Sequence, residues 1–382
     1  MGEDPHIPYQ RPPLSKQYLA SEHGIERVYL RPEKFYAERN IAVRVGLRVE
    51  TIDASARTLA CSDGSTVAYD KLLLATGTRP RVLRAPGIEL AGIHYLRTLG
   101  DVDAIKAEIS PGKKLVIIGG GYIGLEVAAV AVQAGLAVTV LEMEDRILQR
   151  VTTPEMSTFY DNLHTSHGVT INTNTAAESF TGANGEGGAA GDAGVNTVVC
   201  TDGTNVPAEI VVIGIGVVPN VEVADAAGID CDNGILVDEH CRTSDANIYA
   251  AGDCTNHPNP LLGRRLRLES VPNAMEQARV AASNMNGNDK NYASVPWFWS
   301  DQYDLKLQMV GFSADGNNQV VRGDTDAGQF AIFYFDDDVL VAADAVNSAK
   351  EFMVCRQLVG QKVDKRALGD PATDLKTLLA PR

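Results

Sequence analysis

Short runs of Val, Ile and Leu that end near glycine recur along the first two thirds of the chain. The clearest are Lys71–Ala75, Lys114–Ile118, Ala137–Leu141 and Ile210–Ile213. Apolar runs without alternation are typical of strands buried on both faces of a parallel sheet. Between the second and third runs, Tyr122–Gln133 has helical periodicity and stops before Gly135. The pattern predicts a βαβ unit in a doubly wound α/β domain over residues 101–232.

The pattern changes in two other places. Gly182–Gly194 is glycine-rich and lies between short strand patterns, so we expect a hairpin loop there. After Pro296 the chain becomes rich in aromatic residues, and Gln329–Phe335 belongs to the strand patterns of this region. This part predicts an antiparallel α+β domain over residues 296–382.

Length and charge narrow the class of protein. A chain of 382 residues is long enough for two or three domains. A net charge of −15 disfavours a general surface for nucleic acid or for an anionic membrane. The apolar run around Ala128–Ala134 is too short to span a bilayer, and Met1–Gln10 does not resemble a signal peptide. We therefore expect a cytoplasmic α/β enzyme.

The six cysteines contain no C-x-x-C pair. This spacing argues against a disulfide scaffold, a zinc ribbon and a thioredoxin-type redox centre. The histidines also lack metal-ligand spacing. His164 and His167 lie three residues apart without partner ligands, and we expect both on the surface of a helix.

A glycine-rich turn follows the predicted strand Lys114–Ile118. Its sequence is Gly119-Gly120-Gly121-Tyr122-Ile123-Gly124, which matches G-x-G-x-x-G and opens the predicted helix. In this motif the first glycine permits a tight turn, the second lets the backbone approach a pyrophosphate, and the third allows close helix–strand packing. The helix N-terminus then offers free N–H groups to phosphates. The turn predicts a dinucleotide site.

Glu142 stands at the end of the next predicted strand. A carboxylate at this position hydrogen-bonds the ribose 2′-hydroxyl and repels a 2′-phosphate, so the site is expected to prefer NADH to NADPH. A surface ion pair between Glu142 and Arg146 is the alternative interpretation.

Three further strand ends carry candidate cofactor contacts. Ala75-Thr76-Gly77 and Gly214–Pro219, which includes Gly216, are glycine-bearing crossovers that could approach a cofactor or be plain turns. Asp253 follows a third buried strand, where its carboxylate could accept a hydrogen bond from a polyol such as ribityl. Alternatively, Asp253 caps a following helix.

Seven motifs together give a specific resemblance. They are RPPLSK (11–16), ATG (75–77), GGGYIGLE (119–126), GIGVVPN (214–220), YAAGDC (249–254), LESVPNAMEQA (268–278) and PWFWSDQYD (296–304). In this order they resemble the FAD-dependent, NADH-oxidising ferredoxin reductases of bacterial oxygenase systems. The resemblance implies two Rossmann-like dinucleotide-binding domains of the glutathione reductase type plus a C-terminal α+β domain. The expected division is 1–100 and 233–295 for the FAD-binding domain, 101–232 for the NAD-binding domain and 296–382 for the C-terminal domain.

The beginning of the chain departs from this family. Family members open with a βαβ unit whose own G-x-G-x-x-G binds the FAD pyrophosphate. Met1-Gly2-Glu3 falls where the second strand of that unit has just ended. The resemblance therefore predicts an FAD-binding domain truncated at its N-terminus.

The resemblance also implies roles for single residues. Lys16 is expected beside the flavin ring, paired with Glu126 near the junction of nicotinamide and flavin; an ordinary surface pair is the alternative. The other expected FAD contacts are Val49, Arg97, Asp253, Val271 and Trp299, and the expected NAD contacts are Gly119, Gly121, Tyr122, Ile123, Gly124 and Glu142. Further cofactor contacts are expected at Arg11, Ala75, Thr76, Gly77 and Gly216. For Arg97 the alternative is a linker charge, and for Trp299 it is the core of the C-terminal domain.

The resemblance implies hydride transfer from NADH to FAD and electron transfer to an external carrier, a [2Fe–2S] ferredoxin. The lack of a cysteine before Cys61 argues against a redox disulfide as the exit. Arg264, Arg265 and Arg267 are the candidate docking patch for an acidic ferredoxin, unless they form a solvated face. Rubredoxin, quinone or oxygen as acceptor, or a flavin-free NAD-binding remnant, stay open as alternatives, as do monomer and homodimer.

Overall fold

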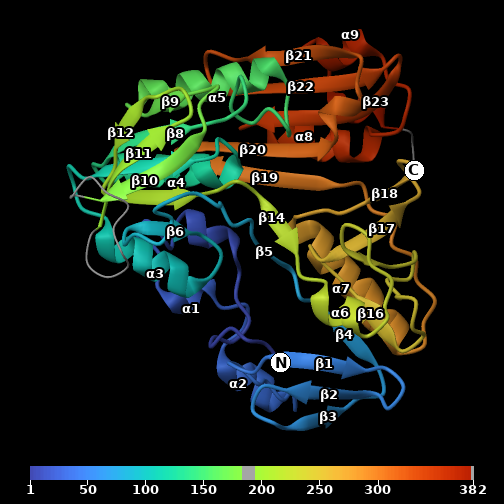
Figure 1. Cartoon of the computed structure of the whole chain (residues 1–382). Helices are drawn as coiled ribbons and strands as arrows, with labels where there is room; N and C mark the ends of the chain where they lie inside the picture. The colour runs from blue at the N-terminus through green and yellow to red at the C-terminus, as the bar shows by residue number, and fades with distance from the viewer. Residues whose placement is uncertain (183–193, 380–382) are drawn as a thin grey trace.

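The computed structural model describes residues 1–182 and 194–379, in which three regions pack together (Figure 1). The middle region is built on a five-stranded parallel sheet of order β6-β13-β7-β8-β9. Its strands are β6 (Ile93–Tyr95), β7 (Lys114–Ile118), β8 (Ala137–Leu141), β9 (Thr170–Asn172) and β13 (Ile210–Ile213). The predicted helix is α4 (Tyr122–Gln133), which joins β7 to β8 and confirms the predicted βαβ unit.

The two faces of this sheet are covered differently. Leu115 and Ile117 face a core that includes α3 (Leu99–Glu108), α4 and α5 (Pro154–Ser166). Val116 and Ile118 face the three-stranded antiparallel sheet of β10 (Ala177–Gly182), β11 (Val195–Cys200) and β12 (Asn205–Pro207). The middle region therefore differs from a doubly wound domain with helices on both faces. The predicted hairpin joins β10 to β11, but its loop residues 183–193 lie outside the described residues.

The first region is assembled from two separated stretches of chain. Its strands are β1 (Val49–Asp53), β2 (Thr58–Cys61), β3 (Thr66–Ala68), β4 (Leu72–Leu74), β15 (Ile235–Leu236), β16 (Ile248–Ala250), β17 (Thr255–Asn259) and β18 (Arg264–Leu266). Its helical elements are η1 (Pro12–Ser15), α1 (Ile25–Val28), α2 (Glu33–Glu38), α6 (Glu222–Ala226) and α7 (Val271–Met285). The parallel pair of β4 and β16 joins the two stretches.

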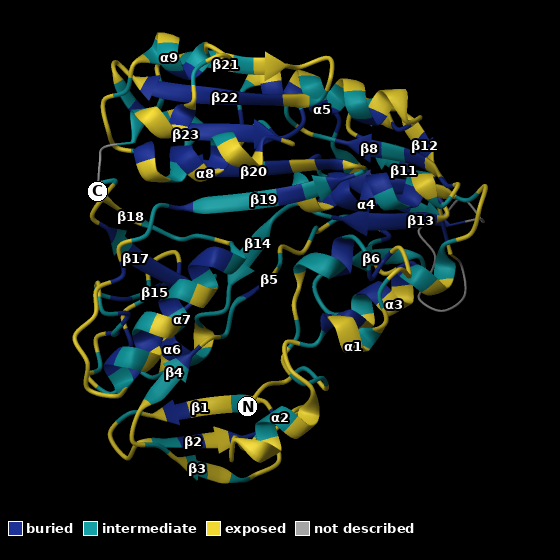
Figure 2. Ribbon diagram, turned by 180° about the vertical axis from the view of Figure 1, so that it is seen from behind, coloured by how far each residue is buried: buried dark blue, intermediate teal, exposed yellow. Residues whose placement is uncertain are grey.

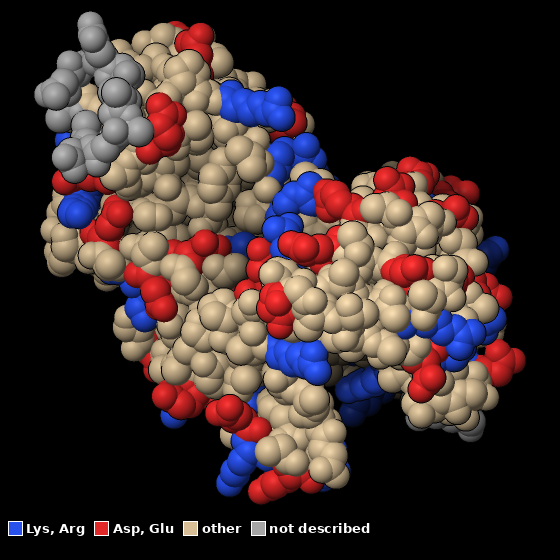
Figure 3. All heavy atoms as spheres, turned by 60° about the horizontal axis from the view of Figure 1, so that its bottom comes forward, with Lys and Arg blue, Asp and Glu red and all other residues tan. Residues whose placement is uncertain are grey.

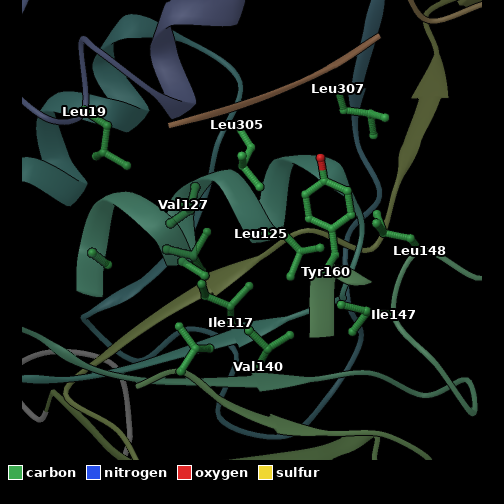
Figure 4. Close-up of a cluster of buried hydrophobic side chains, with 14 of the residues drawn as sticks. Leu19, Ile117, Leu125, Val127, Val140, Ile147, Leu148, Tyr160, Leu305 and Leu307 are labelled. Atoms are coloured by element: carbon green, nitrogen blue, oxygen red, sulfur yellow. The ribbon is translucent and has the colours of Figure 1, made fainter. Parts of the chain in front are cut away.

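The C-terminal region is the predicted antiparallel α+β domain. Its sheet has the order β19-β20-β23-β22-β21, formed by β19 (Trp297–Gln302), β20 (Leu305–Gly311), β21 (Asn318–Asp324), β22 (Gln329–Asp336) and β23 (Val339–Val346). The helical elements are η2 (Ser313–Asp315), α8 (Ala349–Leu358), α9 (Lys365–Gly369) and η3 (Leu375–Leu378). One face of the sheet packs on α8, and the other shares a core with α4 and α5. In Figure 4, Leu305 and Leu307 of β20 lie close to Leu125 and Tyr160 in that shared core.

The sheets place the edges of the middle region differently from the predicted 101–232. β6 belongs to the parallel sheet although it precedes residue 101, and α6 packs on β1 of the first region. The two glycine-bearing crossovers, Ala75–Gly77 and Gly214–Pro219, meet in the antiparallel pair of β5 (Thr78–Pro80) and β14 (Val217–Pro219). Figure 2 shows buried residues concentrated in the middle and C-terminal sheets. Among the described residues, none of the helices has the length and apolarity needed to span a bilayer.

Candidate functional site

The glycine turn between β7 and α4 is tightly packed on one side and open on the other. A Cβ at Gly119 would lie 2.5 Å from the Gly214 carbonyl oxygen, and one at Gly124 would lie 2.3 Å from the Gly119 carbonyl oxygen. A Cβ at Gly121 would meet no atom within 4 Å. Gly121 is the N-cap of α4 and has no side-chain cap. The turn therefore has the open approach and free N–H groups that a pyrophosphate needs.

The side chains of this turn do not all face the same way. The Tyr122 hydroxyl donates to Met309 Sδ at 2.8 Å, and its ring lies 5.1 Å from that of Phe298. Burial raises the pKa of Tyr122 well above its usual value. Only its backbone can thus serve the predicted site, whereas the Ile123 side chain is half exposed.

Glu142 is held by the backbone at the edge of the turn. Its Oε2 accepts a hydrogen bond from the Gly120 N–H at 2.7 Å, and its Oε1 accepts one from the Glu144 N–H at 2.9 Å. The Arg146 guanidinium instead donates to the Ser157 hydroxyl and the Gln149 carbonyl. The alternative of a Glu142–Arg146 pair is therefore wrong, and a ribose contact for Glu142 stays a prediction.

A buried ion pair lies four residues into the same helix. Glu126 Oε2 accepts from Lys16 Nζ at 2.7 Å and from Ser15 Oγ at 2.5 Å, and its Oε1 accepts from Ser300 Oγ at 2.6 Å. The side chains of Lys16 and Glu126 are 11% and 3% exposed, so the pair is not a surface pair. Burial raises the pKa of Glu126, and the charge of Lys16 opposes that rise most strongly.

A second charged pair lies at the crossovers. Arg97 and Asp253 are 3.5 Å apart, with both side chains about one fifth exposed. Burial raises the pKa of Asp253, which Arg97 counteracts. The Arg11 guanidinium donates to the Arg97 carbonyl oxygen. Because Asp253 leads into β17 and not into a helix, the alternative of a helix cap is wrong.

Gly77 lies beside this second pair. A Cβ there would lie 3.3 Å from Arg97 Nη2. The Thr76 hydroxyl donates to the Asn220 carbonyl, and the Asn220 side chain donates back to the Thr76 carbonyl. These bonds hold the two crossovers side by side, Ala75–Gly77 against the segment that contains Gly216.

The polar groups around Asp253 fit a cofactor rich in polar atoms. Arg97 Nε and Gln277 Nε2 are buried without a hydrogen-bond partner among the described residues. Gln277 Oε1 accepts from the Gly252 N–H at 2.7 Å, so this side chain is held at the turn that carries Asp253. Buried polar groups are rarely left unpaired, so these atoms are suited to a bound ligand such as FAD.

The remaining predicted FAD contacts lie on three elements. Val271 begins α7, whose N-cap Ser270 accepts from the Asn273 N–H. Trp299 is half-buried on β19 next to Trp297, and it is Trp297 that packs against the C-terminal core. Val49 starts β1, in a separate sheet. Their contacts with FAD stay predictions.

Two partners of Glu126 and the burial of one histidine were not predicted from the sequence. Ser15 and Ser300 were not predicted, and His164, expected on the surface, is fully buried on α5. The spacing of Met156, Tyr160 and His164 at every fourth residue is the signal that places His164 on the buried face.

The three candidate docking arginines are engaged within the chain. Arg264 makes two hydrogen bonds to Asp315 and Arg267 pairs with Glu269, while Arg265 donates to the Val237 and Asn256 carbonyls. In Figure 3, Lys and Arg side chains stand beside Asp and Glu over the visible face. These contacts do not support a free basic patch, so docking at these residues stays a prediction.

Comparison with known proteins defines the class. The model of the pyridine nucleotide-disulphide oxidoreductase family matches residues 1–278, and the reductase C-terminal model matches residues 297–379. The chain belongs to this family.

Individual relatives are also similar over nearly the whole chain. Rhodocoxin reductase of Rhodococcus erythropolis is 42% identical over 100% of this chain and 88% of its own. The ferredoxin–NAD(+) reductase component of the anthranilate 1,2-dioxygenase system of Burkholderia cepacia is 44% identical over 99% of this chain and 92% of its own. The reductase in the covalent putidaredoxin reductase–putidaredoxin complex superposes with a TM-score of 0.93 at 42% identity, covering 99% of this chain and 90% of that one.

The predicted truncation of the FAD-binding domain is not borne out by these comparisons. The family model matches from residue 1, and the relatives match over 99–100% of the chain.

Proposed function

We propose that the chain passes electrons from NADH, through bound FAD, to a [2Fe–2S] ferredoxin that serves an oxygenase. The observation that carries the proposal is the buried Lys16–Glu126 pair. Glu126 stands on the helix that begins at the dinucleotide turn, and Lys16 follows η1 of the first region. The orphaned polar atoms of Arg97 and Gln277 are the second element of the site. The relatives at 42–44% identity include ferredoxin and rhodocoxin reductases, which supports this acceptor class.

When bound, FAD supplies the step from a two-electron hydride donor to one-electron acceptors. The chain's part is to bind and to orient. The N-terminus of α4 and Gly121 would hold the NADH pyrophosphate, and Glu142 would bind the adenosine ribose. Asp253, Arg97 and the Gln277 amide would hold polar atoms of FAD. This orientation sets the geometry of hydride transfer.

Lys16 and Glu126 would fix the charge beside the reacting rings. The pair is almost excluded from water, and a fixed charge in such a place interacts with a reacting group far more strongly than in bulk solvent. Lys16 also donates to the Pro12 carbonyl at 3.3 Å, which ties its ammonium to η1.

The cysteines support an exit of electrons without a redox disulfide. All six are free thiols, and five of them are buried. A cytoplasmic location belongs to the same proposal, since free thiols are typical of reducing compartments.

The proposal is tested by absorption spectroscopy of the purified full chain, before and after anaerobic addition of NADH. A flavin band that bleaches with NADH and returns when a [2Fe–2S] ferredoxin is added supports it. Rubredoxin and a quinone serve as competing acceptors, and faster reoxidation by either would overturn the ferredoxin assignment. A colourless chain that still binds NADH would instead indicate an NAD-binding remnant.

A further inference from the structure

The Glu126 carboxylate is the end point of a continuous hydrogen-bond network whose residues are buried except for Tyr303, which is half-buried. Tyr303 Oη lies 3.0 Å from His164 Nδ1, and His164 Nε2 lies 2.8 Å from Gln302 Oε1. Gln302 Nε2 lies 3.1 Å from Ser300 Oγ, which lies 2.6 Å from Glu126 Oε1. The hydrogen-bond network therefore runs from Tyr303, in the turn after β19, to the charged pair of Glu126 and Lys16.

The Glu126 carboxylate determines which group donates and which accepts in every hydrogen bond of this network. An ionised carboxylate only accepts, so the Ser300 hydroxyl donates to Glu126 and in turn accepts from the Gln302 amide N–H. The Gln302 oxygen then faces His164, whose Nε2–H donates to it. His164 Nδ1 is left as the acceptor for the Tyr303 hydroxyl. All four donors point toward Glu126.

His164, the histidine of this hydrogen-bond network, is neutral at physiological pH. His164 is fully buried, and burial lowers its pKa to about 4. A neutral imidazole has one donor and one acceptor, and both are used here. Ser300 and Gln302 are fully buried as well, at 0% and 1% exposure.

The hydrogen-bond network connects the middle region with the C-terminal region. Glu126 and His164 stand on α4 and α5 of the middle region, whereas Ser300 and Gln302 stand on β19 of the C-terminal region. Residues 300 and 302 share one face of the strand because side chains alternate along it. The other face carries Trp299 and Asp301. Only this register of β19 delivers the serine hydroxyl to Glu126.

We propose that Ser300, Gln302 and His164 are positioning residues that keep the Glu126 carboxylate ionised and turned toward Lys16. The proposal rests on the proposed function, in which this pair stands beside the reacting rings. Without the Ser300 hydroxyl, Oε1 would lose a donor while Oε2 kept Lys16 and Ser15, so the carboxylate would be less well compensated.

Among the described residues, the ionisable groups that act on this carboxylate are Lys16, next to η1, and Tyr160 on α5, while His164 is linked to it through Gln302 and Ser300. Asp301 lies on the other face of β19, where it pairs with Lys306, and Asp344 of β23 contacts Thr152 and Tyr334. Lys16 is the cation in contact with Glu126 among the described residues. The local hydrogen-bond donors therefore carry much of the remaining compensation.

The first test is the titration of Glu126 in the oxidised full chain, without NADH or ferredoxin. Side-chain ¹³C NMR of glutamate-labelled protein reports it, and the signal lost in Glu126→Gln assigns the resonance. Ser300→Ala is expected to raise the midpoint by about one pH unit, a tenfold change in the acid constant. Gln302→Met and His164→Leu are expected to raise it less, because they act through Ser300.

Thr152→Val is the matched control. The Thr152 hydroxyl is also buried and donates at 2.8 Å to another buried carboxylate, Asp344, between the same two regions. This variant perturbs the same interface but is expected to leave the Glu126 midpoint unchanged. An equal shift in Thr152→Val, or no shift in Ser300→Ala, overturns the proposal. If the midpoint of the Glu126 titration shifts in Ser300→Ala but not in Gln302→Met or His164→Leu, the positioning role of Gln302 and His164 is refuted.

The second readout is the pH profile of flavin reduction by NADH, followed by stopped flow. Its midpoint is expected to move with the Glu126 titration in Ser300→Ala. A moved titration with an unmoved profile overturns the positioning role in the reaction. Failure of NADH to reduce the wild-type chain would instead refute the proposed function, and the NMR titration would still decide whether the donors hold the carboxylate.

Discussion

The buried Lys16–Glu126 pair allows a quantitative prediction about stability. Its two charges lie 2.7 Å apart with side chains 11% and 3% exposed. At an effective dielectric constant of about 20, this separation corresponds to an attraction of about 6 kcal/mol, much of it offset by desolvation. Removing one partner leaves the other buried and uncompensated, at a typical cost of about 3–5 kcal/mol. Because Ser15 and Ser300 still donate, we expect Lys16→Met to lower the free energy of unfolding by about 3 kcal/mol at pH 8.

The loss is expected to depend on pH. Burial raises the pKa of Glu126, and loss of the Lys16 charge raises it further. A carboxyl group with a raised pKa in the folded state contributes stability that is present below its unfolded pKa and is lost as pH rises through the folded pKa. The deficit of Lys16→Met relative to the wild type should therefore be smallest at acidic pH and should grow as the pH rises.

Urea unfolding of the full chain at a series of pH values measures this deficit. Lys306→Met is the matched control, since its ammonium lies 2.5 Å from Asp301 but is 52% exposed, and an exposed pair contributes at most about 1 kcal/mol. Glu126→Gln added to Lys16→Met should recover part of the loss by removing the stranded charge. If Lys16→Met costs no more than Lys306→Met, or if the double variant gains nothing, the reasoning is refuted.

Three further predictions concern other parts of the molecule. Gly121→Ala should leave the thermal unfolding temperature unchanged but weaken NADH binding, measured by calorimetry, at least tenfold. Gly124→Ala, whose Cβ would lie 2.3 Å from a carbonyl oxygen, should lower both the unfolding temperature and the affinity for NADH. Equal unfolding temperatures for the two variants would contradict this prediction. Burial raises the pKa of Asp344 to about 6, so the stability this carboxyl group contributes is present below about pH 4 and lost as pH rises through 6; Asp344→Asn should remove about 3 kcal/mol of that pH dependence in urea titrations. Arg265→Ala should destabilise the chain by about 2 kcal/mol because three buried acceptors lose their donor. Arg264→Ala serves as its control and should cost under about 1 kcal/mol. A larger loss of stability in Arg264→Ala than in Arg265→Ala, measured by urea unfolding, would show that these contacts are misassigned.

The sequence was sufficient for the central architecture because local signals and burial agree there. The apolar runs at Lys114–Ile118 and Ala137–Leu141 and the helix Tyr122–Gln133 have in the structure the limits that their pattern indicates. The second covering layer could not be derived in the same way. Its strands β10–β12 form a separate antiparallel sheet, and whether such a sheet covers another one depends on contacts with residues far away in the chain.

The candidate site was only partly predictable for a related reason. Lys16 and Glu126 belong to motifs, and the structure brings them into contact as expected. Ser300 and Gln302 have no motif of their own, and their role depends on which face of β19 is turned toward α4. The register of a strand against a helix in another region is a tertiary property that alternation along the strand does not fix.

The position of β19 has a consequence for exchanging parts between related proteins. The C-terminal sheet is not an independent attachment, because two of its side chains complete the surroundings of a carboxylate on α4. A chimera that takes residues 296–382 from one relative and the rest from another would join a helix and a strand selected in different molecules. Such a chimera should retain the electron-transfer chemistry of its parents only if Ser300, Gln302 and the α5 histidine are inherited together.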